Sequence, residues 1–297
     1  MVDYSEPIKH HYIPQFILKN FCFDPSRRRV NFHNVKTGKI VVKLVSEVFM
    51  QKNLYRDELN HLDTPTQIEK DLAKYESDVA KIIKRFLVNN DIRLTVKENE
   101  SLLLFFAVMG LRSCNTLTGF KNASGNTKEF YQKFQSDGNF EDFWKRNLGF
   151  IVKCRSIAEI VSHPQIDEPM KLFMQRDAFG IFGKYFIVLE RRGDEDFLIG
   201  DSYPVMITGD NKLPMFAYCP LSPERILIIA SNGVEGVPFG VRQFNDNVIK
   251  KPTIWMDEIQ ITVKKIYEQV VHEINQDFIK HSHIGLVFKD VNRVNLV

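Results

Sequence analysis

The stretch around which the chain is organised, residues 10 to 21, reads His10-His11-Tyr12-Ile13-Pro14-Gln15-Phe16-Ile17-Leu18-Lys19-Asn20-Phe21. Two imidazoles precede a proline, and a short aromatic-rich run follows it. Proline suits the first turn of a helix, because its φ is already fixed and its missing N–H is not needed there. We therefore expect a short helix over residues 15–21, entered by a segment that carries both histidines.

The composition is that of an ordinary folded protein. Of the 297 residues, 44% are hydrophobic and 26% are charged, and the net charge is +3. A balance so close to neutral gives no general electrostatic argument for nucleic-acid binding. The 24 phenylalanines predict a core filled largely by aromatic rings.

Neither a zinc site nor secretion is indicated. The four cysteines are far apart and form no Cys-x-x-Cys pair, so we expect reduced thiols rather than zinc ligands or disulfides. The N-terminus lacks the basic-then-apolar pattern of a signal peptide. The longest apolar run, residues 102–111, is about half the length of a membrane span. We expect a cytoplasmic protein without a membrane partner.

Strand signals fall in two regions. Residues 29–35 and 39–45 are β-rich runs joined by a short connection that contains Gly38, which predicts a hairpin. A second hairpin is predicted over residues 185–200, and a buried strand over 225–231.

Two helices are predicted between these regions. Over residues 66–88, apolar side chains recur on one stripe at helical spacing. Glu69 and Glu76 are seven positions apart and share one shoulder of this stripe, whereas Asp71 and Asp78 share the other.

The second helix opens at Thr95-Val96-Lys97-Glu98, a capping-box pattern. Its run over residues 102–109 is apolar on all sides, so we expect this helix to be central and buried. Arg112 lies in its last turn.

We expect an α+β fold. A helical N-terminal half with a small β-hairpin packs on a mainly antiparallel sheet from the C-terminal half, and a long helix over residues 257–281 closes the chain. No repeat or linker divides the sequence, so residues 1–297 are expected to form a single domain. The Gly- and Asn-rich stretch 119–128 is predicted to be a mobile loop.

The opening stretch resembles that of domain-of-unknown-function family 4238. That family begins His-Tyr-x-Pro-x-x-x-Leu-x-x-Phe, and the matching residues here are His11, Tyr12, Pro14, Leu18 and Phe21. Further similar pieces follow in order: the turn Asn53-Leu54-Tyr55, the helix with paired glutamates, the buried helix that ends at Arg112, the turn Pro220-Leu221-Ser222-Pro223, and Asn275. Residues 115–170 are not covered. The resemblance implies a fold and a set of site residues, but no activity.

The aspartate of the site has two candidates. In the family, one residue separates a hairpin aspartate from a proline, whereas Ser202 and Tyr203 both follow Asp201 here. Asp210 is therefore a competitor of Asp201.

Polar residues from distant segments form the predicted site. The candidate catalytic set comprises His11, Glu69, Glu76, Arg112 and Asp201. Imidazole and carboxylates suit a divalent metal such as Mg²⁺ or Mn²⁺, for which we expect His11, Glu69 and Asp201 as ligands, while Arg112 would bind phosphate. We expect His10 to face solvent. Further polar residues assigned to the site are His10, Gln15, Asn20, Tyr55 and Asn275.

Two classes of function fit this set. In the first, a bacterial or mobile-element protein is a metal-dependent hydrolase of the nuclease or phosphoesterase type, with nucleic acid or a nucleotide as substrate. In the second, the protein is a non-catalytic binding or effector protein in which the same residues form a buried structural network. The sequence decides neither between these two classes nor the oligomeric state.

Overall fold

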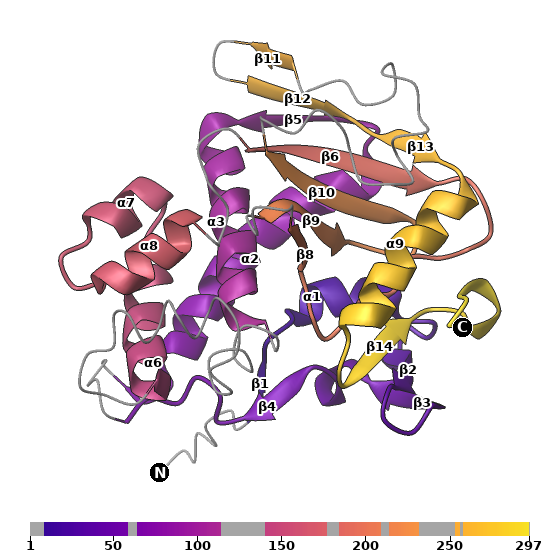
Figure 1. Cartoon of the computed structure of the whole chain (residues 1–297), viewed down its shortest axis with the longest axis horizontal. Coiled ribbons are helices and arrows are strands. Elements are labelled where there is room, and N and C mark those ends of the chain that lie inside the picture. Colours follow the sequence, from indigo (N-terminus) through magenta and orange to yellow (C-terminus); the bar gives the residue numbers. More distant parts are fainter. Residues whose placement is uncertain are drawn as a thin grey trace.

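The strands come mainly from the N- and C-terminal regions of the chain, and most of the helices come from its middle (Figure 1). The computed structural model describes residues 9–58, 64–113, 140–176, 184–208, 214–231, 253–255 and 258–296. The fold is mixed α+β, but the expected layout is wrong. Strands lie in the N- and C-terminal regions and form several sheets, and helices lie between them. The predicted loop 119–128 lies outside the described residues.

Pairing between distant strands explains the difference. The predicted hairpin is confirmed as β2 (Arg29–Asn34) and β3 (Lys39–Leu44). However, β2 also pairs with β14 (Gly285–Phe288), which in turn pairs with β7 (Ile199–Gly200). The resulting four-stranded sheet joins the two ends of the chain. A periodic pattern identifies a strand but not its partner, so the sequence does not show this arrangement.

The largest sheet contains β13 (Lys264–Ile266), β6 (Lys184–Arg191), β10 (Arg225–Ser231), β9 (Pro214–Pro220) and β8 (Val205–Thr208), in that order. Its central strand β10 is buried, as predicted. The predicted second hairpin is wrong, because β6 pairs with β10, whereas β7 belongs to the four-stranded sheet with β14 and β2.

A three-stranded sheet replaces the first half of the predicted C-terminal helix. It consists of β11 (Thr253–Trp255), β12 (Glu258–Thr262) and β5 (Asp91–Thr95). The last helix, α9 (Glu268–His281), begins only after β13. Residues 258–262 alternate polar and apolar, and this two-residue period lets Ile259 and Ile261 pair with β5.

Two helices form the centre of the molecule. α2 (Gln67–Val88) buries the predicted apolar stripe, and α3 (Val96–Arg112) is buried from Leu102 to Arg112. The capping box is confirmed: the Glu98 N–H donates to Thr95 Oγ1 at 3.2 Å, and the Thr95 N–H donates to Glu98 Oε2 at 3.0 Å. Figure 1 shows α6 (Phe140–Ile151), α7 (Ile157–Ser162) and α8 (Glu168–Arg176) beside this pair.

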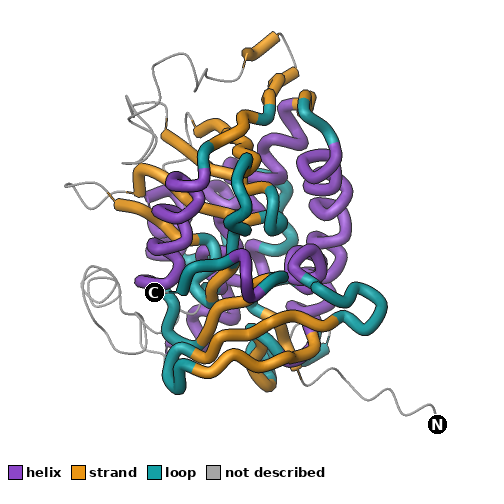
Figure 2. The backbone as a smooth tube through the Cα atoms, turned by 90° about the vertical axis from the view of Figure 1, so that its right-hand side faces the viewer, coloured by secondary structure: helices purple, strands orange, loops and turns teal. Residues whose placement is uncertain are grey.

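In Figure 1 the opening stretch runs from β1 (Lys9–His11), below α3, to α1 (Gln15–Leu18), on the right of α3. Its histidines lie on β1 (Lys9–His11), which pairs with β4 (Met50–Lys52). The predicted short helix is α1 (Gln15–Leu18), continued by the 3₁₀ turn η1 (Lys19–Phe21). Further 3₁₀ turns are η2 (Val45–Glu47) and η3 (Val291–Arg293). Figure 2 shows strands crossing the lower part of the molecule in side view.

Buried apolar side chains gather in two clusters. The larger surrounds α3 and includes the fully buried rings of Phe21, Phe105 and Phe106. The smaller lies between the largest sheet and α9, and includes Phe197 and Phe278. Rings thus contribute strongly to both. None of the described helices is long and apolar enough to cross a membrane.

Candidate functional site

Arg112 is the centre of a buried polar network at the end of α3. Its side chain is only 2% exposed. Nε donates to the Tyr55 hydroxyl at 2.6 Å, Nη1 donates to Glu76 Oε1 at 2.7 Å, and Nη2 donates to the His11 carbonyl oxygen at 2.6 Å. The guanidinium also lies over the Tyr55 ring, 5.0 Å from its centroid. We call Arg112, Tyr55, Glu76 and the His11 carbonyl the Arg112 network.

β1 supplies a backbone acceptor to this network. The His11 carbonyl accepts from Arg112 and also from the Tyr55 hydroxyl, at 3.2 Å. The His11 ring points elsewhere: Nε2 lies 3.3 Å from the Val45 carbonyl oxygen, and Nδ1 lies 3.3 Å from Gln15 Nε2. A neutral ring with its proton on Nε2 satisfies both contacts. Burial lowers the pKa of His11, which favours this neutral form, although the Val45 contact opposes the shift.

His10 is fully buried, so the expectation that it faces solvent is wrong. Its Nδ1 accepts from the Tyr55 backbone N–H at 2.8 Å. Its ring is stacked on the Tyr55 ring, with centroids 5.5 Å apart and planes inclined by 6°. Burial raises the pKa of Tyr55 far above its usual range, even though the charge of Arg112 acts against this. The phenol therefore keeps its proton, which it donates to the His11 carbonyl.

The two glutamates of α2 have different surroundings. Glu76 forms an ion pair with Arg112 and is 19% exposed. Glu69 forms no hydrogen bond with another described residue. Burial raises the pKa of Glu69 to about 7; the positive charge of Arg112 opposes this shift and the negative charge of Glu76 adds to it. Glu69 is thus a carboxyl group within electrostatic reach of Arg112 that titrates near neutral pH.

Opposing influences act on Arg112 itself. Burial alone would lower its pKa, but the adjacent Tyr55 oxygen and the charge of Glu76 raise it overall. The guanidinium therefore stays charged, and its donors stay committed to the network.

Asp201 lies in another part of the molecule. It is fully buried after β7, and its carboxylate accepts the backbone N–H groups of His283, Ile284 and Gly285 at 3.1 to 3.2 Å. These bonds fix the turn between α9 and β14, and none involves the Arg112 network. Its competitor Asp210 lies outside the described residues.

The model of the family described as "Protein of unknown function (DUF4238)" matches residues 9–291, from β1 to the turn after β14. The chain belongs to the DUF4238 family. The resemblance inferred from the sequence is thereby confirmed at the level of the family. Neither the curated proteins nor the solved structures gave a match.

Two further predicted residues of this DUF4238 protein lie outside the network. Asn20 Nδ2 donates to the Leu221 carbonyl oxygen at 2.8 Å and so joins η1 to the turn before β10. Asn275 is fully buried in α9: its Oδ1 accepts from the Leu198 N–H at 3.2 Å, and its Nδ2 donates to the Asp196 carbonyl oxygen at 2.9 Å. Both side chains hold loops against helices.

Arg225 is a second buried arginine of the DUF4238 protein, and sequence reasoning missed it. Its Nη2 lies 2.6 Å from Glu190 Oε2 of β6, and its Nη1 donates to the carbonyl oxygens of Phe86 and Asn89 at 2.8 and 2.7 Å. It therefore caps the end of α2 from the largest sheet. The available signal was an arginine at the start of a strand that is otherwise apolar.

The expected metal ligands do not converge in this geometry. Across the described part of the chain, no group of three or more His, Cys, Asp or Glu residues is arranged to hold a metal ion. Of the expected ligands, Glu69 lies near Arg112, the His11 ring contacts Val45 and Gln15, and Asp201 binds backbone amides.

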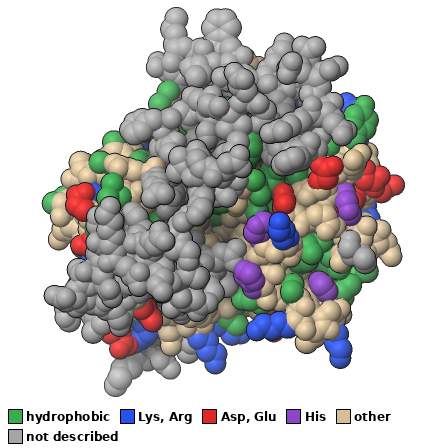
Figure 3. All heavy atoms as spheres, in the orientation of Figure 1, with side chains coloured by type: hydrophobic (Ala, Val, Ile, Leu, Met, Phe, Trp, Pro, Cys, Tyr) green, Lys and Arg blue, Asp and Glu red, His purple; other side chains and the backbone are tan. Residues whose placement is uncertain are grey.

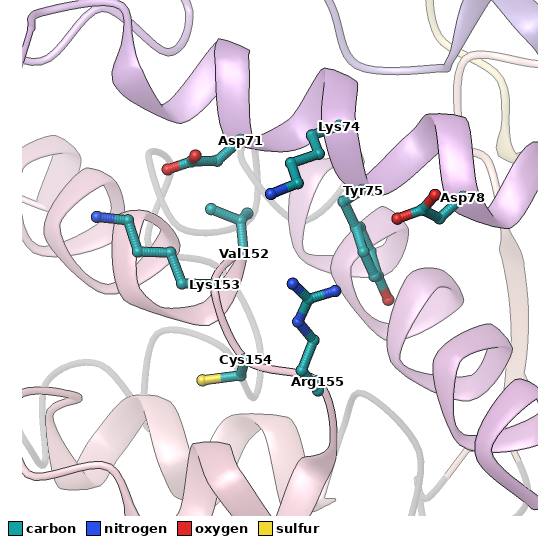
Figure 4. Close-up of a pocket in the computed structure, with 8 residues that line it drawn as sticks. All are labelled: Asp71, Lys74, Tyr75, Asp78, Val152, Lys153, Cys154 and Arg155. Atoms are coloured by element: carbon teal, nitrogen blue, oxygen red, sulfur yellow. The ribbon is translucent and has the colours of Figure 1, made fainter.

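A pocket of about 130 Å³ lies on the shoulder of α2 that carries Asp71 and Asp78 (Figure 4). In Figure 4 the Lys74 ammonium and the Arg155 guanidinium point into the space between α2 and the segment after α6. Two carboxylates face three cations, so the lining favours no ligand of a single charge sign. Its residues are Asp71, Lys74, Tyr75, Asp78, Val152, Lys153, Cys154 and Arg155.

Proposed function

We propose that this protein acts by binding rather than by catalysis, and that the Arg112 network is its internal support. One observation carries this proposal: Arg112 is 2% exposed, and all three of its nitrogens already donate to protein acceptors. An arginine that binds a phosphate presents free donors to an open site. Arg112 instead directs its donors at β1, Tyr55 and α2.

The Arg112 network holds the short strand β1 in place. β1 is three residues long and pairs only with β4 within the described residues, which gives it few backbone bonds of its own. Two donors, the Arg112 guanidinium at 2.6 Å and the Tyr55 hydroxyl at 3.2 Å, converge on its last carbonyl. A hydrogen bond to a charged group contributes about 1.5–3 kcal/mol. The network thus holds β1 on the central helices.

Hydrogen exchange tests this role. In Arg112→Met, the amides of residues 9–12 should lose protection before the amides of α3 do, because β1 loses its strongest anchor. Arg93→Met is the matched control, since the Arg93 side chain is 71% exposed. Unchanged protection of residues 9–12 in a folded Arg112→Met protein would reject the proposed support.

A second candidate function rests on Glu69. A carboxyl group with a pKa of about 7 and no hydrogen-bond partner among the described residues suits general acid–base catalysis at neutral pH. In this alternative the protein is a hydrolase of the nuclease or phosphoesterase type, and Glu69 transfers a proton to or from the reacting group of the substrate.

Turnover decides between the two candidates. The protein is incubated with nucleic acid and with nucleotides in Mg²⁺ or Mn²⁺, alongside Glu69→Gln, His11→Ala and Asp78→Asn. Loss of a measurable wild-type activity in Glu69→Gln, but not in Asp78→Asn, would support the hydrolase. Asp78 is the control because it lies on the opposite shoulder of α2 and pairs with Lys81.

A further inference from the structure

β3 forms an exposed apolar edge of the four-stranded sheet. Among the described strands it pairs with β2 alone. The side chains of Ile40, Val41 and Leu44 are each 41% exposed, and that of Val42 is 55% exposed. An edge strand leaves alternate backbone N–H and C=O groups without a partner strand, so it can accept one more strand. The Leu44 N–H already donates to Glu47 Oε2 at 3.1 Å, so the open part of this edge is residues 39–43.

The hairpin that carries this edge is strongly basic. Between Asp24 and Glu47 the chain has no acidic residue. Figure 3 shows lysine and arginine side chains along the lower edge, where Figure 1 places β2, β3 and β4. A second copy of the chain would bring the same positive charge, so self-pairing is disfavoured and an acidic partner is favoured. The basic residues are Arg27, Arg28, Arg29, Lys36, Lys39 and Lys43.

The two faces of β3 differ in chemistry. Successive strand residues point to opposite faces, so Lys39 and Lys43 share a face with Val41. Lys43 Nζ lies 4.2 Å from the centroid of the Phe32 ring, and Phe32 is the register partner of Val41. The other face is a row of aliphatic side chains, namely Ile40, Val42 and Leu44.

A strand laid against β3 would meet these faces alternately. Residues opposite the lysines are best acidic, and residues opposite the aliphatic row are best β-branched or otherwise apolar. We propose that β3 is a docking strand for an extended segment of a partner protein in which acidic and apolar residues alternate. The inference goes beyond the role of the Arg112 network and rests on the proposal that the protein acts by binding.

A peptide fits this edge better than a nucleic acid does. Phosphates would neutralise the lysines, but they would leave the aliphatic row and the backbone edge unused. Single-stranded nucleic acids are bound largely by stacking of bases on aromatic side chains, whereas the exposed apolar residues of β3 are all aliphatic.

Fluorescence anisotropy with a labelled Glu-Val repeat peptide tests the proposal. Two control peptides are used: one has the same composition with all glutamates grouped before all valines, and one has proline at alternate positions, which removes backbone donors. The alternating peptide should bind at least tenfold more tightly than either control. Equal affinity for all three peptides would overturn the docking strand, as would tighter binding of a single-stranded oligonucleotide or of anionic lipid vesicles.

Charge reversal locates the site. Lys39→Glu combined with Lys43→Glu should weaken binding of the Glu-Val peptide at least tenfold and create binding of a Lys-Val repeat peptide. Lys74→Glu combined with Lys84→Glu reverses the same charge on exposed positions of α2 and should change neither affinity. An equal loss in both double variants would overturn the assignment to β3. Failure here is distinct from failure of the proposed support, which the exchange of residues 9–12 measures.

Discussion

Glu69 has a chemistry that its place in the sequence does not predict. On the helix it is one of two equivalent glutamates, spaced to share one shoulder of α2. In the fold, Glu76 receives the Arg112 guanidinium, whereas Glu69 is left partly buried without a hydrogen bond to a described residue. A carboxylate in that position is poorly solvated, so the group holds a proton up to about pH 7.

The pKa of Glu69 predicts a pH dependence of stability. Between its ordinary pKa of 4.5 and the folded-state value of about 7, the folded state holds a proton that the unfolded state has lost. The stabilisation that Glu69 gains from holding its proton in the folded state is thus fully present below pH 4.5 and is lost as the pH rises through 7. Its size is on the order of 2 kcal/mol after allowance for partial exposure. Urea unfolding of wild type and Glu69→Gln at several pH values should show wild type losing stability relative to the variant over this window.

The stability of wild type must be compared with that of Glu69→Gln, because the titration of His11 changes the stability of both proteins in the opposite direction. Its pKa is lowered from 6.5, so the unfolded state binds a proton that the folded state does not, and stability rises with pH through this region. The comparison with Glu69→Gln cancels this contribution. A wild-type-minus-variant difference that stays flat from pH 4.5 to 7 would show that Glu69 titrates normally.

At the scale of elements, local signals in the sequence predicted what local interactions decide. The capping box at Thr95, the apolar stripe of α2 and the β2–β3 hairpin each depend on residues close together in the chain, and each is present. The C-terminal helix was predicted too long because residues 258–266 pair with strands far away in sequence. Such pairing overrides local helix preference.

The turn between α9 and β14 shows an element fixed by one distant side chain. The Asp201 carboxylate accepts three successive backbone N–H groups there, and it is fully buried. Asp201→Ala should lower the free energy of unfolding by about 3 kcal/mol, because buried amides lose a charged acceptor. Asp201→Asn should cost less, since one oxygen acceptor remains. Equal stability of wild type and Asp201→Ala in urea unfolding would contradict the structural role of this carboxylate.

At the scale of the whole molecule, two buried arginines join helices to strands. Arg112 joins α3 to β1, and Arg225 joins the end of α2 to β6 and β10. The sequence identified Arg112 through the family resemblance, and the fold brings it together with Tyr55 and Glu76 as a network. The sequence could not show the partners of Arg225 or Asp201, because these partners are distant in the chain. The Asp201 partners lie more than 80 positions away, and those of Arg225 lie up to 139 positions away.

The structural role of the buried arginines is tested by comparing Arg225, which caps the end of α2 from β10, with Arg85, which lies in the last turn of α2. Arg225 is 9% exposed in its ion pair with Glu190, whereas Arg85 is 36% exposed in its ion pair with Glu98. Arg225→Met should cost about 3–5 kcal/mol of unfolding free energy, because it leaves Glu190 and the helix-end carbonyls unpaired. Arg85→Met should cost less than about 1 kcal/mol. Equal losses in urea unfolding would remove the distinction between the buried Arg225–Glu190 pair and the half-buried Arg85–Glu98 pair.

The most direct test of the central claim is the free energy of unfolding of Arg112→Met, measured in urea beside wild type and the exposed control Arg93→Met. The structural network predicts a loss of about 3–5 kcal/mol for Arg112→Met, because Glu76, Tyr55 and the His11 carbonyl all lose a buried donor. The control should stay within about 0.5 kcal/mol of wild type. An Arg112→Met protein as stable as Arg93→Met would contradict the claim that this arginine holds the fold together.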